Sequence, residues 1–170
     1  MRLYITGPVG SGKTTLARRI SSLTGVRCVH LDEVVYEPDP TDSWGNRKRP
    51  IPERDALFGE ILAAPDYIVE DAGRECFIEA MAQADWVVLL EPPMRVRYWQ
   101  IVRRWARQNL GLERSGYRPR LAVLRAMFRW TRNYATGADG TRARAQRFAD
   151  KLIVLHTRRD VERYLSSLAR

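Results

Sequence analysis

The residues whose types and spacing most clearly indicate chemistry form a glycine-rich segment, Gly7-Pro8-Val9-Gly10-Ser11-Gly12-Lys13-Thr14. It fits the pattern Gly-x-x-x-x-Gly-Lys-Thr without a mismatch. In this pattern the glycines let backbone N–H groups cradle phosphates, the lysine reaches the β and γ oxygens, and the threonine hydroxyl ligates Mg²⁺. We therefore predict binding of ATP and Mg²⁺, with Lys13 catalytic and Thr14 on the metal. The predicted nucleotide contacts are Gly7, Val9, Gly10, Ser11, Gly12, Lys13, Thr14 and Thr15.

The segments on either side of this loop supply the strand and the helix that the motif requires. Residues 3–5 form a short apolar run typical of a buried strand. From Thr15 to Leu23, apolar residues recur at helical spacing, at Leu16, Ile20 and Leu23. A glycine-rich turn without a ligand is the alternative, and this strand–loop–helix context argues against it.

Similar apolar runs and periodic segments continue along the chain. Further strands are predicted at residues 26–31, 67–69, 86–90 and 152–155. Helices are predicted at 52–63, 75–82, 95–109, 121–134 and 158–168, and loops at 37–52, 110–120 and 136–141. Alternating strands and helices predict an α/β, three-layer P-loop NTPase fold with a five-stranded parallel sheet. We expect one domain over residues 1–170, with a helical lid inserted between the fourth and fifth strands at about residues 95–147, as in small P-loop kinases.

Positive charge is concentrated in that insertion. Residues 95–147 hold 14 arginines and two acids, a net charge of +12 in a chain of net charge +9, so the remainder carries −3. A closing arginine stabilises the charge that develops on a transferred phosphoryl group. We predict Arg103, Arg104 and Arg107 as catalytic lid residues, with Arg114, Arg118 and Arg120 in the loop beyond. Many of the fourteen must instead form a solvated face.

Acidic residues follow the predicted strands, where an open parallel sheet binds its ligand. Asp32 is predicted to hold the acceptor or accept its proton, and Glu70 and Asp71 to hold the metal together with Thr14. The alternative for each acid, Glu91 included, is a helix cap or a solvated loop position. Arg74 is predicted to clamp an acceptor anion, with a surface ion pair as the alternative. His30 is more simply explained as a structural histidine than as a base.

Other side chains have plain explanations. The lid aromatics are better explained by packing between two helices than by base stacking; they are Tyr98, Trp99, Trp105, Phe128, Trp130 and Tyr134. Cys28 and Cys76 are expected to be reduced, buried thiols.

No apolar run approaches a membrane span, and a strand and loop that begin at Met1 leave no room for a signal peptide. We expect a cytoplasmic protein without a membrane partner.

Taken in order, these pieces resemble a known family. The phosphate loop, His30-Leu31-Asp32, residues 84–92, Arg97-Tyr98-Trp99 and Arg103-Arg104 resemble the adenylate-kinase-related "DNA topology modulation protein" group. Residues 152–155 and Arg158 continue the likeness, and Arg158 is included among the nucleotide contacts. The resemblance implies a nucleoside-monophosphate-kinase-like fold with ATP and Mg²⁺. That family usually carries Asp-Gly-Asn-Tyr after the third strand, where this chain has residues 70–74, Glu-Asp-Ala-Gly-Arg.

The leading functional hypothesis is an ATP-dependent phosphotransferase. It would transfer the γ-phosphoryl group to a small acceptor, either a nucleotide or a hydroxylated metabolite. The alternative is a nucleic-acid-associated NTPase or a regulatory nucleotide-binding protein, which the +12 segment motivates. Nucleic acid is thus a possible partner but not the favoured one.

Overall fold

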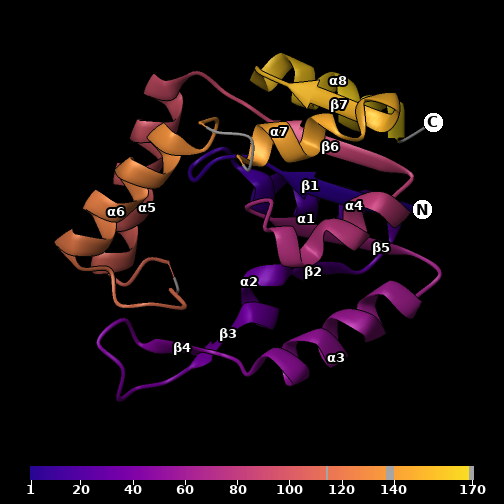
Figure 1. The fold of residues 1–170 in the computed structure, drawn as a ribbon. Coiled ribbons are helices and arrows are strands. Elements are labelled where there is room, and N and C mark those ends of the chain that lie inside the picture. Colours follow the sequence, from indigo (N-terminus) through magenta and orange to yellow (C-terminus); the bar gives the residue numbers. More distant parts are fainter. Residues whose placement is uncertain (114, 137–139, 169–170) are drawn as a thin grey trace.

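The chain is built on a five-stranded parallel sheet, seen in the computed structural model of residues 1–113, 115–136 and 140–168 (Figure 1). The strands are β1 (Arg2–Thr6), β2 (Cys28–His30), β5 (Tyr67–Asp71), β6 (Trp86–Leu90) and β7 (Leu152–Leu155). Their order across the sheet is β2-β5-β1-β6-β7, and every pair is parallel. The strand that precedes the phosphate loop is therefore central, with acid-bearing β5 beside it. The parallel five-stranded sheet is confirmed.

Helices cover both faces of the sheet, because successive residues of its central strand point to opposite sides. Leu3 and Ile5 pack with α1 (Lys13–Thr24) and α8 (Arg158–Leu168). Tyr4 packs on the other side, within a core formed with α2 (Leu31–Val35), α3 (Ile51–Ala63), α4 (Ile78–Gln83) and α7 (Thr141–Gln146). The two cores give the predicted three layers. Within the ranges given above, no helix has both the length and the apolar character to cross a membrane.

The segment expected to be a loop at residues 37–52 is partly ordered into strands. It contains an antiparallel hairpin of β3 (Tyr36–Pro38) and β4 (Asn46–Lys48). Glu37 crosses this hairpin to pair with Arg47 at 2.7 Å and with Arg49 at 3.0 Å. Strands of three residues are too short to show an alternating pattern, so the sequence prediction was wrong here.

Several predicted boundaries also shift. β5 includes Glu70 and Asp71, which pair in register with Ile5 and Thr6, whereas the prediction placed both acids after the strand. The predicted strand 26–31 shortens to β2, since α2 begins at Leu31. Two short 3₁₀ turns, Glu75–Phe77 and Ala149–Lys151, precede α4 and β7.

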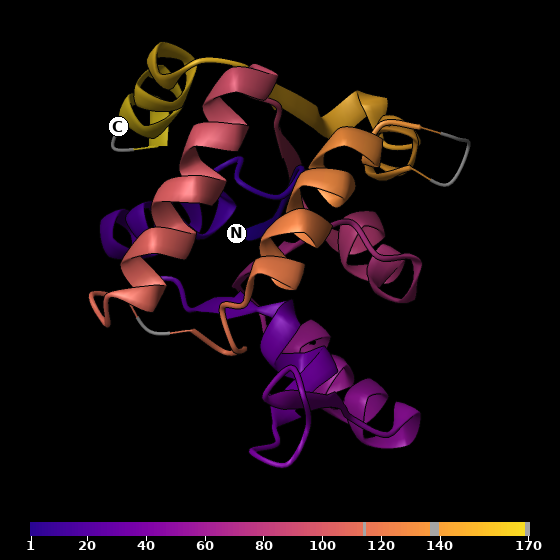
Figure 2. The same ribbon diagram turned by 90° about the vertical axis from the view of Figure 1, so that its left-hand side faces the viewer.

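The insertion between β6 and β7 contains a helical hairpin of α5 (Met94–Asn109) and α6 (Leu121–Asn133), followed by α7 (Figure 2). Tyr98 and Phe128 meet edge-to-face between the helices, with ring centroids 5.0 Å apart. Trp99 and Trp130 do not share this packing and are 61% and 49% exposed, which corrects the expectation that the aromatics all form core. Each helical residue is rotated about 100° from the previous one, so Trp99 points away from the seam that Tyr98 fills.

Both cysteines are free, but they are less buried than expected. Cys28 is half-buried, and Cys76 is exposed in the 3₁₀ turn before α4 while its neighbour Phe77 is fully buried. The expectation of two buried thiols was therefore wrong for Cys76. Arg114 and part of the predicted loop 136–141 lie outside the described residues.

Candidate functional site

The phosphate loop joins β1 to α1 and adopts a backbone that requires glycine. Gly7, Gly10 and Gly12 have φ values of 149°, 76° and 94°, and a side chain is rarely found there. A Cβ at Gly7 would collide with the carbonyl oxygen of Leu90, and one at Gly10 would lie 2.7 Å from that of Arg97. The loop is thus packed closely between β6 and α5.

The first turn of α1 is arranged to receive an anion. It carries no acidic residue, and no side chain caps its backbone N–H groups in the described part of the chain. Lys13 extends over the loop, where its Nζ donates to the carbonyls of Gly7 at 3.0 Å and Pro8 at 3.2 Å. Unpaired N–H groups, the positive end of the helix and a lysine together favour phosphate.

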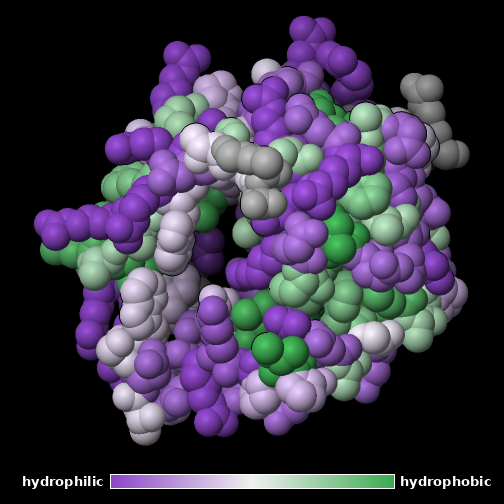
Figure 3. Space-filling model, in the orientation of Figure 1, coloured by the Kyte–Doolittle hydropathy of each residue, from purple (hydrophilic) through white to green (hydrophobic). Residues whose placement is uncertain are grey.

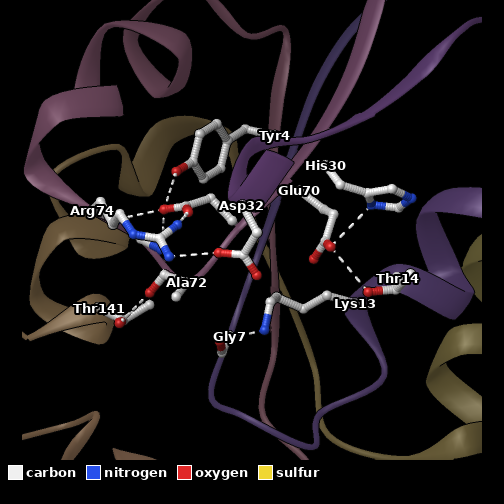
Figure 4. A network of polar contacts seen from close by, with 12 residues as sticks. Tyr4, Gly7, Lys13, Thr14, His30, Asp32, Glu70, Ala72, Arg74 and Thr141 are labelled. Carbon is white, nitrogen blue, oxygen red and sulfur yellow. Dashed lines mark hydrogen bonds and ion pairs between the residues drawn. The ribbon is translucent and has the colours of Figure 1, made fainter. Parts of the chain in front are cut away.

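Glu70 of β5 lies beside the threonine predicted to ligate magnesium (Figure 4). The Thr14 hydroxyl donates to Glu70 Oε1 at 2.9 Å, and His30 Nδ1 lies 3.0 Å from the same oxygen. Burial raises the pKa of Glu70, but the hydrogen bond from His30, the charge of Lys13 and the hydrogen bond from Thr14 outweigh burial and bring it below its ordinary value. The Glu70 contact in turn raises the pKa of His30. The sheet thereby joins an ionised carboxylate to the predicted metal-ligating hydroxyl.

Thr14 and Glu70 supply two of the oxygen ligands that a Mg²⁺ ion needs. A hydroxyl and a carboxylate oxygen are ligands that Mg²⁺ accepts, and it commonly takes its remaining ligands from water and substrate phosphates. Over the described ranges, no group of three or more His, Cys, Asp and Glu side chains could hold a metal alone. Thr14 and Glu70 could therefore hold the ion only together with nucleotide phosphates.

Asp71 belongs to the opposite face of the sheet from its neighbour Glu70. Its side chain is fully buried and accepts hydrogen bonds from the Tyr4 hydroxyl at 3.3 Å and from the backbone N–H groups of Gly73 and Arg74 at 2.6 Å each. The Arg74 guanidinium also pairs with it. These partners occupy Asp71 and leave Glu70 as the better candidate for the metal.

The side chains of Asp32 and Arg74 form an ion pair, although Asp32 lies on α2 and Arg74 lies in the turn after β5. One guanidinium nitrogen of Arg74 pairs with Asp32 and the other with Asp71, and the guanidinium lies 5.8 Å from the Tyr36 ring. Figure 4 shows Asp32 between Arg74 and Lys13. The ion pair that the sequence left as the alternative for Arg74 is therefore present, and its partners are Asp32 and Asp71.

The predicted lid arginines lie on the distal part of α5. Arg104 and Arg107 lie 3.7 Å and 3.4 Å from Glu113, and Arg103 lies over the Trp99 ring at 5.2 Å. No hydrogen bond or ion pair joins these three to the phosphate loop in the structure as described. Arg158 begins α8 with its side chain exposed. Their contact with nucleotide stays a prediction.

Thr131 of α6 attaches the helical hairpin to the phosphate loop, and Arg97, which the family resemblance included, joins α5 to α6 and to the segment after β6. The buried Thr131 hydroxyl of α6 donates to the Val9 carbonyl at 2.8 Å. Buried Arg97 of α5 donates to the carbonyls of Pro92 at 2.8 Å and Thr131 at 3.1 Å. The sequence did not single out Thr131, because a predicted helix does not show which of its residues face the loop.

The far end of the helical hairpin contacts the β3–β4 hairpin. Arg118 donates from its backbone to Trp44 O and from its side chain to Pro40 O, both at 2.7 Å, and Asn46 donates to Gly116 O at 2.7 Å. Figure 3 shows a hollow between the α5–α6 hairpin and the remainder of the molecule. The structure therefore encloses a space beside the phosphate loop from two sides.

Glu91 lies just beyond the end of β6 and contacts a separate group of side chains. It pairs with the Tyr134 hydroxyl, and its carboxylate lies 3.6 Å from Arg142 Nε and 3.7 Å from His156 Nδ1. Burial, the hydrogen bond to Glu91 and its charge raise the pKa of Tyr134 to about 12. Glu91 is therefore a nearly buried partner of three side chains, and neither the helix cap nor the solvated loop position of the alternative describes it.

Solved structures of several kinases share this architecture. A sugar kinase from Janibacter sp. HTCC2649 is 16% identical with a TM-score of 0.54, and the match covers 99% of this chain and 97% of that one. A shikimate kinase from Acinetobacter baumannii in complex with shikimate is 17% identical with a TM-score of 0.53, covering 98% and 89%. A deoxyadenosine kinase from M. mycoides with bound dATP is 12% identical with a TM-score of 0.53, covering all of both chains.

At such identities the likeness shows the fold, which this chain shares with P-loop kinases. No protein-family model matches the chain, and no curated protein matches it. The assignment of a reaction therefore depends on the geometry of the site.

Proposed function

We propose that this protein is an ATP-dependent kinase that transfers the γ-phosphoryl group to a hydroxyl of a small acceptor. The observation that carries the proposal is the position of Asp32 across from Lys13, at the phosphate-loop end of the sheet (Figure 4). A carboxylate there can accept the acceptor's proton while Lys13 stabilises the phosphates. The kinase neighbours, which are a sugar kinase and two kinases solved with shikimate or dATP, support this reaction class.

Each residue then has a defined task. Backbone N–H groups of residues 7–15 and Lys13 hold the phosphates of ATP, and Thr14 with Glu70 would hold Mg²⁺. When bound, Mg²⁺ would supply positive charge that offsets the negative charge of the ATP phosphates. Asp32 accepts the hydroxyl proton as the acceptor oxygen bonds to the γ-phosphorus. The bond from that phosphorus to the bridging oxygen breaks, which releases ADP and a phosphate ester.

We assign further contacts to the insertion and to the closing helix. Arg103, Arg104 and Arg107 would approach the γ-phosphoryl group, and Arg158 would contact the nucleotide. This requires the first three to leave their present neighbours, Trp99 and Glu113. The motif order also supports one domain over residues 1–170 and membership in the adenylate-kinase-related group described above.

The test follows ADP formation by the purified protein with ATP and Mg²⁺, with and without a panel of hydroxylated compounds. We expect at least one compound to accelerate ADP release and to be recovered as its phosphate ester. Equal ADP release with and without every compound would contradict the kinase assignment.

A nucleic-acid-associated NTPase is the second candidate, favoured by the exposed Trp99–Arg103 pair on α5. Arginines and aromatic rings on one surface can hold a phosphate backbone and stack bases. DNA binding measured at low and physiological salt, with ATP hydrolysis followed in parallel, tests it. The absence of binding at physiological salt would remove this candidate.

A further inference from the structure

The Arg74 guanidinium faces the acceptor side of the phosphate loop, but its charge is already engaged (Figure 4). One nitrogen pairs with buried Asp71 and another with Asp32, whose side chain is 67% exposed. The cluster of Arg74, Asp71 and Asp32 thus contains one cation and two carboxylates, and its net charge is about −1. Burial lowers the pKa of Arg74, but the charges of Asp71 and Asp32 outweigh it and raise the pKa, which keeps the guanidinium charged.

The surrounding turn holds Arg74 in this arrangement. Asp71 accepts hydrogen bonds from the N–H groups of Gly73 and Arg74, and the Thr141 hydroxyl donates to Ala72 O at 2.6 Å. Gly73 has φ 85°, and a Cβ there would lie 2.6 Å from Thr141 Cγ2. Turning Arg74 toward an anionic acceptor would leave the buried Asp71 carboxylate without its cation, which is costly.

Among the neighbouring cations, Lys13 donates to two loop carbonyls and is assigned to the phosphates of ATP, and two arginines are paired with acids. Arg49 donates to Val34 O of α2 and pairs with Glu37 at 3.0 Å. Arg144 donates to Gly73 O at 2.8 Å and pairs with Glu75 at 2.6 Å. Neither adds an unpaired positive charge beside Asp32 and Arg74.

We propose that the acceptor is an uncharged polyhydroxy compound, such as a sugar, polyol or nucleoside, and not a phosphate or carboxylate. The inference rests on the proposed kinase function and identifies the substrate class of that site. Arg74 is then a positioning residue, which fixes one oxygen of Asp32. The second Asp32 oxygen, which has no partner among the described residues, accepts the hydroxyl. This replaces the prediction that Arg74 clamps an acceptor anion.

The main test compares acceptors in matched pairs that differ by one anionic group, such as adenosine with 3′-AMP and sorbitol with gluconate. For pairs that react, the uncharged member should have a kcat/KM at least about tenfold higher, because like charges brought together at a site repel. An anionic member that reacts equally well or better would overturn the acceptor class and leave the kinase function standing. No turnover with any compound, while ATP still binds, would overturn both.

The role of Arg74 is tested by Arg74→Gln with Glu33→Gln as a control, since Glu33 is an exposed acid beside Asp32 on α2. With an uncharged acceptor, Arg74→Gln should lower kcat about 10- to 100-fold and change KM less than about threefold, because it misplaces the base. Glu33→Gln should leave both constants unchanged. A higher KM at unchanged kcat would show that Arg74 binds the acceptor and would overturn the proposal. The matched pairs use the unaltered protein, so that result does not depend on a variant folding.

Discussion

The Thr14 hydroxyl donates a 2.9 Å hydrogen bond to Glu70 Oε1, which joins the first turn of α1 to the end of β5. The two residues are 56 positions apart and meet because β1 and β5 are neighbours in the sheet. This contact places a carboxylate beside the hydroxyl that the phosphate-loop motif assigns to magnesium. The Mg²⁺ concentration that turnover requires should therefore be set by both residues.

Glu70→Gln should raise the Mg²⁺ concentration needed for half-maximal turnover about 10- to 100-fold, because it removes the negative charge beside Thr14 while keeping an oxygen acceptor. The measurement is a Mg²⁺ titration of ADP formation at saturating ATP. Glu79→Gln, an exposed carboxylate on α4, is the matched control and should leave the titration unchanged. An unaltered Mg²⁺ requirement in Glu70→Gln would exclude Glu70 from the metal site.

Lys13→Ala should reduce phosphoryl transfer by about three orders of magnitude, because the lysine stabilises charge that develops on the transferred group. The fold should stay intact, since the only hydrogen bonds of the Lys13 side chain in the described structure are to two loop carbonyls. Turnover and circular dichroism report the two properties separately. Arg163→Ala removes an exposed cation from α8 and should keep full activity. Retained turnover in Lys13→Ala would contradict the proposed mechanism.

Two glycine substitutions should have opposite effects. Gly10→Ala places a Cβ 2.7 Å from the Arg97 carbonyl at φ 76°, so it should destabilise the loop and abolish ATP binding. Gly59→Ala adds a methyl group in open space on α3 and should increase the free energy of unfolding by about 0.5–1 kcal/mol. Urea unfolding measures the stability of each variant, and ATP titration measures its affinity for ATP. Wild-type ATP affinity in Gly10→Ala would show that the loop tolerates the added carbon.

Thr131→Val should lower the free energy of unfolding by about 1–3 kcal/mol, because it leaves the Val9 carbonyl without its buried donor. ATP affinity should also fall, since this hydrogen bond attaches α6 to the phosphate loop. The control is Thr136→Val at an exposed position, where the change should stay within about 0.5 kcal/mol. Equal stability of the two variants would show that the Thr131 contact contributes little.

The phosphate loop and the parallel sheet were predictable because their signals are local. The spacing of Gly7, Gly12, Lys13 and Thr14 specifies a loop with a helix behind it, and continuous apolar runs indicate strands covered on both faces. The hairpin at residues 36–48 was missed because its strands are three residues long, and Glu37 finds its ion-pair partners 10 and 12 positions further along the chain. Its formation depends on contacts across the hairpin that local propensity does not show.

The sequence by itself determined that this chain has a glycine-rich loop of the phosphate-binding pattern, acids near the ends of its strands and an arginine-rich insertion. Only the tertiary structure decided what those charges do. Glu70 and Asp71 are adjacent in the chain, yet they face opposite sides of β5 and take different partners. From the sequence alone Arg74 could bind an anion, but in the fold its guanidinium is paired with Asp32 and Asp71. Charge is a property of each residue, whereas the partner that neutralises it is set by strand order and by the turns that bring distant segments together.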